Sequence, residues 1–129
     1  MSESVKNPKA MVDFGCLKGL ISSNPKFMVS DIDGVAERNG RFLALEIKTP
    51  NDTLSEGCSR MLKSLSSIPQ FMCVLANVTG NRSSTGGILF EPTSIHRITK
   101  DGLSVVEDCN LEQFEEKYIK WYNRVNNIR

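Results

Sequence analysis

The spacing of apolar residues along the chain predicts helices and strands in alternation. Apolar positions recur at helical spacing from about Pro8 to Ser22 and again from about Thr53 to Ser66. A third helical stripe follows Asn110-Leu111-Glu112-Gln113, which has the form of a capping box. Residues 70–78 form a nearly continuous apolar run, as expected of a buried central strand. The pattern therefore predicts a single domain with an α/β fold.

Turn signals place two hairpins in the remaining sequence. Asn39-Gly40 lies midway through residues 27–48, and Asn-Gly is the strongest short-range signal for a two-residue turn. Lys100-Asp101-Gly102 marks the turn of a second hairpin at about 88–106. Residues 79–87 are rich in glycine and serine and predict a flexible polar loop between the central strand and this hairpin.

Composition fits one small domain that spans residues 1–129. The chain contains no apolar run long enough to cross a bilayer, and we expect no signal peptide and no membrane association. Its four cysteines show no Cys-x-x-Cys pairing, so we expect buried free thiols in a reducing cytoplasm. The net charge is +1, so binding of nucleic acid would depend on a local basic patch.

The first hairpin gathers charged side chains on one face. With the turn at Asn39-Gly40, Asp33 faces Glu46 and Asp31 faces Lys48, with Cβ atoms roughly 5 Å apart across the pair. Like charges directly opposite each other are destabilising, so stability alone does not explain the pair of Asp33 and Glu46. The opposite face of the second strand is apolar and can be buried: Leu43, Leu45 and Ile47. Carboxylates converging beside a lysine form a divalent-metal site that suits phosphodiester cleavage.

Basic residues elsewhere are candidates for contacts with a DNA backbone. Arg82 lies in the glycine-rich loop, whereas Lys26 and Lys9 precede the hairpin and are expected near its charged face. Contacts to phosphate require no particular sequence, so isolated lysines and arginines can serve. A solvated surface charge is the alternative interpretation for each of them.

The hairpin motif resembles that of the PD-(D/E)XK nuclease superfamily, an Asp on one strand and Glu/Asp-x-Lys on the next. The stretch SDIDGVAERNGRFLALEIKTP is similar to small, often phage-borne members of unassigned substrate, and its spacing resembles archaeal Holliday-junction resolvases. The resemblance covers about residues 27–78. It implies a restriction-endonuclease-like core, which is a mixed β-sheet flanked by helices. It also implies a metal-dependent endodeoxyribonuclease that uses Mg²⁺, with Mn²⁺ able to substitute.

The resemblance also implies a role for each residue of the motif. Asp33 and Glu46 would supply metal-binding carboxylates, and the main-chain carbonyl of Ile47 would supply a third ligand. Lys48 would hold or help to deprotonate the attacking water and offset charge on the phosphate. Asp31 would tune the lysine or bind a second metal, unless it is only an exposed charge at the start of the strand.

The sequence departs from the family pattern at two places. Ile32 precedes Asp33, where classical members have proline, so either Asp31 or Asp33 can be the family aspartate; the register favours Asp33. Cys58 stands where many relatives carry glutamine.

Two alternatives to an active nuclease stay open on the sequence. One is a catalytically inactive nuclease-fold module that binds nucleic acid or a host protein. The other is a viral host-interaction protein whose hairpin charges are merely solvated. For the nuclease, DNA is the expected partner, and the expected location is the cytoplasm, that of the host cell if the protein is viral. Cutting both strands needs two active sites, so a homodimer is expected on duplex or junction DNA.

Overall fold

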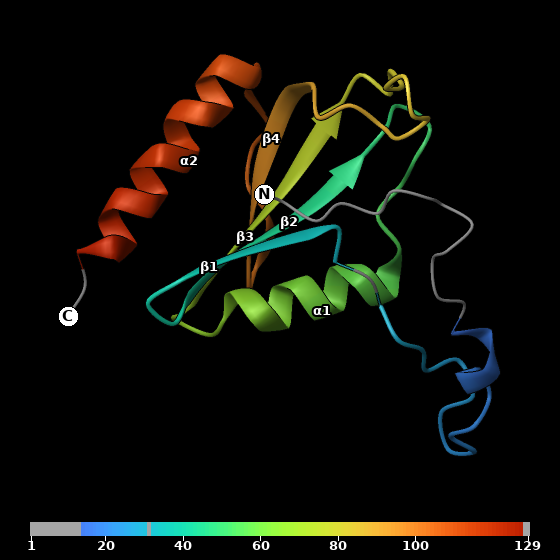
Figure 1. Ribbon diagram of the computed structural model, residues 1–129. Coiled ribbons are helices and arrows are strands. Elements are labelled where there is room, and N and C mark those ends of the chain that lie inside the picture. The colour runs from blue at the N-terminus through green and yellow to red at the C-terminus, as the bar shows by residue number, and fades with distance from the viewer. Residues whose placement is uncertain (1–13, 31, 128–129) are drawn as a thin grey trace.

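A mixed six-stranded sheet with two helices forms the core of the computed structural model, which describes residues 14–30 and 32–127 (Figure 1). The strand order is β1-β2-β3-β4-β5, and the short β6 also pairs with β4. The strands are β1 (Gly34–Arg38), β2 (Arg41–Lys48), β3 (Phe71–Val78), β4 (Pro92–Thr99), β5 (Gly102–Leu103) and β6 (Glu107–Asp108). The helices are α1 (Glu56–Ser66) and α2 (Leu111–Asn126), and no helix within the described residues is long and apolar enough to cross a membrane. Only β2 and β3 pair in parallel, so the predicted α/β class with a mixed sheet is confirmed.

The two helices cover opposite faces of the sheet (Figure 1). Alternation along β2 sends Leu43 into the core under α2 and Ala44 into the core under α1. β3 lies between β2 and β4 and is buried on both faces, which confirms the central strand predicted at 70–78. Two cores therefore share one sheet, and the candidate site residues of β2, Glu46 and Lys48, face α1.

The first hairpin turns where the sequence predicts. Its register pairs Arg38 with Arg41 and Val35 with Ala44, as expected from a turn at Asn39-Gly40. The φ angles of Asn39 and Gly40 are 55° and 76°, which is the positive region that this turn requires at both residues. The Asn39 side-chain amide also donates to the main-chain oxygens of Val125 (3.1 Å) and Asn126 (3.2 Å). The turn is thus tied to the C-terminal end of α2.

The first strand begins later than predicted. The ladder between β1 and β2 ends at the pair Gly34–Leu45, so residues 27–30, 32 and 33 are not strand. The carboxylate of Asp33 accepts a hydrogen bond from the main-chain N–H of Ile47 at 2.7 Å. A side chain that takes a backbone donor in this way competes with the strand ladder, which explains the early end of the pairing.

Capping residues set where both helices begin. The Ser55 hydroxyl accepts from the main-chain N–H of Cys58 at 3.1 Å, so α1 starts three residues later than predicted and ends at Ser66 as predicted. The predicted capping box of α2 is confirmed, with both reciprocal bonds between Asn110 and Gln113 at 2.9 Å. The apolar stripe predicted for α2 has five members, of which Phe114, Trp121 and Val125 are buried, whereas Leu111 and Tyr118 are exposed.

The prediction of an N-terminal helix is wrong over the part of it that the structure describes, residues 14–22. Residues 8–13 lie outside the described part, and from Phe14 onward the chain forms only the 3-10 helix η2 (Gly15–Leu17) followed by turns. Gly19 has a φ of 78°, which is incompatible with a continuing helix. Phe14, Leu17 and Ile21 are all exposed, so no packed face stabilises a helix here.

The second hairpin and the cysteines agree with the sequence in most respects. The predicted turn at 100–102 is confirmed by the pair Thr99–Gly102, although β4 begins at Pro92 rather than near residue 88. The segment 79–87 is a loop with one isolated bridge, between Arg82 and Ile88. None of the four cysteines forms a disulfide within the described residues; Cys58, Cys73 and Cys109 are buried, whereas Cys16 is exposed, against the prediction.

Candidate metal and phosphate site

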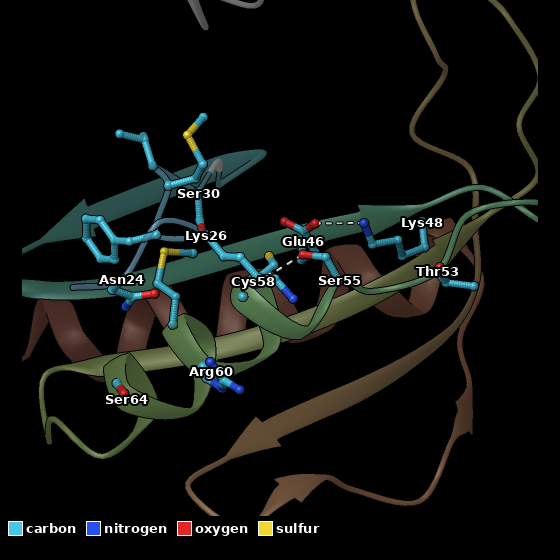
Figure 2. A pocket seen from close by; sticks show the side chains of 15 residues that line it. Asn24, Lys26, Ser30, Glu46, Lys48, Thr53, Ser55, Cys58, Arg60 and Ser64 are labelled. Carbon is cyan, nitrogen blue, oxygen red and sulfur yellow. Dashed lines mark hydrogen bonds and ion pairs between the residues drawn. The ribbon is translucent and has the colours of Figure 1, made fainter. Parts of the chain in front are cut away.

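An open cleft lies between segment 24–30 and α1, and the side chains of Glu46 and Lys48 line it (Figure 2). Its volume is about 870 Å³. Segment 24–30 passes close to the first turn of α1, where a Cβ on Gly57 would lie 4.0 Å from the Ser30 hydroxyl. The cleft is therefore framed by the helix that follows β2 and by the segment that precedes β1.

Glu46 is the buried acid of this cleft. Only 5% of the residue is exposed, and its Oε2 lies 2.9 Å from the Nζ of Lys48. Its other carboxylate oxygen, Oε1, is buried and has no hydrogen-bond partner within the described residues. Burial raises the pKa of Glu46 above its usual value; the hydrogen bond from Lys48 opposes this, and the charge of Asp33 adds to it. The site thus contains a carboxylate with an unsatisfied oxygen.

Lys48 stays charged in this setting. Burial lowers its pKa, but the hydrogen bond and the negative charge of Glu46 raise it by more, so the net pKa lies above the usual value. The side chain of Lys48 is 17% exposed to solvent and lines the open cleft. It is a fixed positive charge at neutral pH.

Asp33 lies at the entry to β1, one position beyond the last strand pair. The predicted cross-strand pair with Glu46 is therefore not part of the ladder, but the charge of Asp33 still acts on Glu46. Its Oδ2 binds the N–H of Ile47, whose side chain packs into the core under α2. The structure thus brings Asp33, Glu46, Lys48 and the Ile47 main chain together, whereas Asp31 lies outside the described residues.

Cys58, in the first turn of α1, lies against the carboxylate. Its thiol interacts with Glu46, and burial together with the charge of that carboxylate raises the pKa of Cys58 to about 11. The thiol is therefore neutral at physiological pH. The sequence indicated that β2 has one apolar face, but it did not reveal that the charged face of the same strand is covered as well. The feature that could have predicted this cover is the amphipathic helix α1, which follows β2 and packs on that face.

The predicted DNA contacts fall in different places. Lys26 lines the cleft and faces the same space as Glu46 (Figure 2). Arg82 does not line it, and its guanidinium donates to the main-chain oxygen of Gly86 at 3.1 Å. Lys9 lies outside the described residues. Arg60 of α1, which the sequence did not single out, also lines the cleft and forms an ion pair with Glu56 one turn before it.

Within the described residues, no three His, Cys, Asp or Glu side chains gather closely enough to hold a metal ion between them. The acidic side chains of the predicted motif that the structure describes here are those of Asp33 and Glu46. Comparison of the chain with models of protein families, with curated proteins and with solved structures found no match.

Proposed function

We propose that this protein is a metal-dependent endodeoxyribonuclease with a restriction-endonuclease-like core, which hydrolyses phosphodiester bonds of DNA in the cleft. The observation that carries the proposal is the buried, unpartnered Oε1 of Glu46 beside the ammonium group of Lys48. Buried polar atoms almost always have partners, so an exception calls for a group that would satisfy it. The resemblance of the hairpin to PD-(D/E)XK nucleases supports the same function.

The donor set fits a hard divalent cation. Mg²⁺ and Mn²⁺ favour oxygen ligands, and Mg²⁺ is commonly held by one or two carboxylates with several waters retained. Glu46 and Asp33 supply the carboxylates. Burial and, to a smaller extent, the charge of Asp33 raise the pKa of Glu46, and a bound cation would offset both. In a strand ladder the N–H and C=O of one residue point toward the same neighbour. The carbonyl of Ile47 therefore faces the Asp33 side of β2, where the ladder has ended, and would be a third ligand.

Each residue has a separate task in this proposal. A bound cation would polarise the phosphorus–oxygen bond and lower the pKa of a coordinated water. Lys48, held as an ammonium by Glu46, offsets the negative charge that develops on the phosphate. Its raised pKa makes it a poor proton acceptor, so its electrostatic role is favoured over removal of a proton from water.

The cleft also suits a nucleic-acid backbone. Lys26 lines it together with Arg60, and both can neutralise phosphates next to the scissile one. The charge of Arg60 is shared with Glu56, so Lys26 is the stronger contact. Cutting both strands of a duplex requires two such clefts, so a homodimer belongs to the proposal.

The second candidate is an inactive nuclease-fold module that binds nucleic acid. It is favoured by the Glu46–Lys48 ion pair, which already occupies one carboxylate oxygen, and by the neutral thiol of Cys58 where relatives often have glutamine. This module would bind DNA in a salt-sensitive manner without turnover.

Cleavage of a panel of labelled DNAs separates the two candidates. Single-stranded, duplex, flap and four-way-junction DNAs would be incubated with Mg²⁺, Mn²⁺ or EDTA. We expect metal-dependent products that are lost in Lys48→Ala and retained in Lys100→Ala, a matched change in the exposed β4–β5 turn. A salt-sensitive gel shift without products under any metal would instead identify the binding module.

A further inference from the structure

A second cavity lies on the other side of the sheet, between α2 and strands β2, β3 and β4. It has a volume of about 300 Å³ and shares no lining residue with the cleft that holds Glu46. Its apolar lining comes from the sheet and from the buried face of the helix: Leu43, Met72, Val74, Ile95, Phe114 and Trp121. This space can hold about ten water-sized volumes, the lower end of the range for small-molecule sites.

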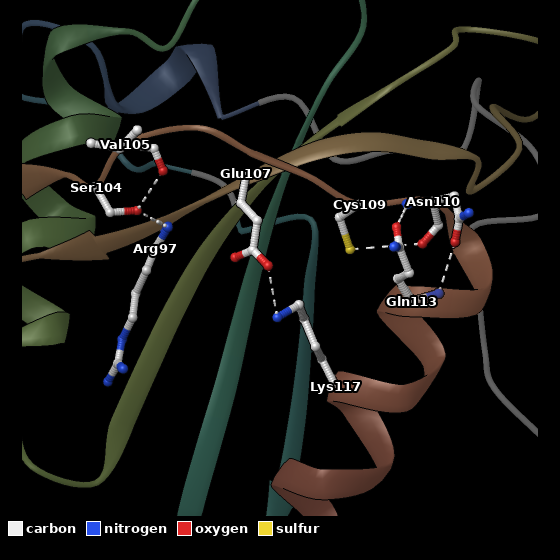
Figure 3. Close-up of polar contacts among 8 residues, drawn as sticks. All are labelled: Arg97, Ser104, Val105, Glu107, Cys109, Asn110, Gln113 and Lys117. Carbon is white, nitrogen blue, oxygen red and sulfur yellow. Dashed lines mark hydrogen bonds and ion pairs between the residues drawn. The ribbon is translucent and has the colours of Figure 1, made fainter.

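Cationic side chains surround this apolar cavity. Arg97 of β4 and Lys120 and Arg124 of α2 line it, and none of the three has a side-chain hydrogen bond or ion pair within the described residues. The fourth cation, Lys117, is already paired, because its Nζ lies 3.0 Å from Glu107, which is the one acidic residue of the lining (Figure 3). Lys120 also lines a small neighbouring hollow with Glu107, Asp108 and Glu116, whereas Arg97 and Arg124 do not.

An adjoining hollow extends the positive end of the cavity. It has a volume of about 130 Å³ and shares Met72, Arg97, Trp121 and Arg124 with the larger space. It adds Arg41, whose guanidinium has only a long contact of 3.5 Å to the main-chain oxygen of Pro69, and its lining contains no acidic residue. Three arginines from β2, β4 and α2 therefore converge beside one tryptophan.

We propose that this cavity binds an amphipathic organic anion, with its apolar body against Trp121 and the sheet and its carboxylate or phosphate head at Arg97 and Arg124. Like charges brought together without counter-charges repel, and a bound anion would remove that cost. Guanidinium groups match carboxylate and phosphate oxygens in paired, charge-assisted hydrogen bonds. A mostly apolar lining with a few placed charges is the usual composition of small-molecule sites. The inference does not depend on the proposed nuclease activity, because the two sites lie on opposite faces of the sheet.

Trp121 is the only tryptophan of the chain, so its fluorescence reports on this cavity directly. The full-length protein would be titrated with decanoate, decyl phosphate and, as the uncharged control, decanol, each below its micelle concentration. We expect a saturable change in Trp121 emission with one or both anions and at least about tenfold weaker binding of decanol. Which anion binds more tightly identifies the preferred head group.

Arginine variants test whether the charges hold the head group. Arg97→Gln and Arg124→Gln should each weaken anion binding by about tenfold, whereas Lys100→Gln in the β4–β5 turn should leave it unchanged. Far-ultraviolet circular dichroism and thermal midpoints would verify that each variant is folded. The proposal is overturned if no anion gives a saturable signal, if decanol binds as tightly as the anions, or if folded arginine variants retain wild-type affinity.

Discussion

Replacement of Lys48 by methionine should destabilise the protein through Glu46. The variant keeps most of the apolar volume of the side chain but removes the cation that lies 2.9 Å from a carboxylate only 5% exposed. Removing one partner of a buried ion pair typically costs about 3–5 kcal/mol, because the other charge stays buried without compensation. Since Lys48 borders an open cleft and water screens its charge in part, we expect a smaller loss than this, about 2–3 kcal/mol at neutral pH.

The loss should depend on pH in a defined direction. The pKa of Glu46 is higher in the folded protein than its ordinary value of 4.5, so the folded state binds this proton more readily than the unfolded state does. Without Lys48 this pKa rises further. The loss of unfolding free energy in the variant is therefore complete above the pKa that Glu46 has in the folded variant. It shrinks as the pH falls toward 4.5, the pKa of Glu46 in the unfolded chain.

Urea unfolding at about pH 7.5 and about pH 4.5 would measure this deficit, with Lys48→Met compared with wild type at each pH. The double variant Glu46→Gln/Lys48→Met removes both charges and should recover at least about 1 kcal/mol of the loss at the higher pH. Lys100→Met is the matched control in an exposed turn. An equal deficit at both pH values, or a double variant no more stable than the single one, would refute the reasoning.

Three further predictions concern a thiol, a turn and a helix cap. At about pH 7.5 iodoacetamide should label Cys16 rapidly and leave Cys58 unmodified, because Cys58 is buried and its pKa is about 11; mass spectrometry that finds both labelled at the same rate would contradict this. Asn39→Ala should lower the free energy of unfolding by about 2 kcal/mol and Asn39→Gly by about 1 kcal/mol, since glycine keeps the positive φ and only the bonds to α2 are lost; equal losses in urea unfolding would argue against the turn geometry. Asn110→Ala should cost about 1 kcal/mol in the same assay by removing the capping box of α2, and unchanged stability would show that the cap is unimportant.

Local signals in the sequence predicted the elements whose geometry they control. Asn39-Gly40 specified both the turn and the pairing of Val35 with Ala44, because a two-residue turn leaves only one register. The capping box at Asn110 located the start of α2 to the residue for a similar reason, since its two hydrogen bonds are made within four residues.

Features that depend on distant contacts were not accessible in this way. The helical stripe at 14–22 was a misleading signal, because apolar spacing stabilises a helix only where another surface covers it, and Phe14 and Leu17 are exposed. The charged face of β2 had the pattern of a solvated surface, but α1 folds over it and buries Glu46. The cationic cavity joins Arg41, Arg97 and Arg124, which are brought together by the order of strands in the sheet and by the packing of α2 on it.

The dependence of DNA cleavage on Mn²⁺ concentration tests the central claim most directly. Single-turnover rates of wild type, Asp33→Asn and Glu46→Gln would be compared with those of Asp101→Asn, an exposed aspartate in the β4–β5 turn. Our account predicts saturable, Mn²⁺-dependent cleavage by wild type and Asp101→Asn, and at least about a hundredfold slower cleavage by the two site variants while they remain folded. Cleavage by folded Glu46→Gln at the wild-type rate and the same Mn²⁺ concentration would contradict the assignment of Glu46 as a metal ligand.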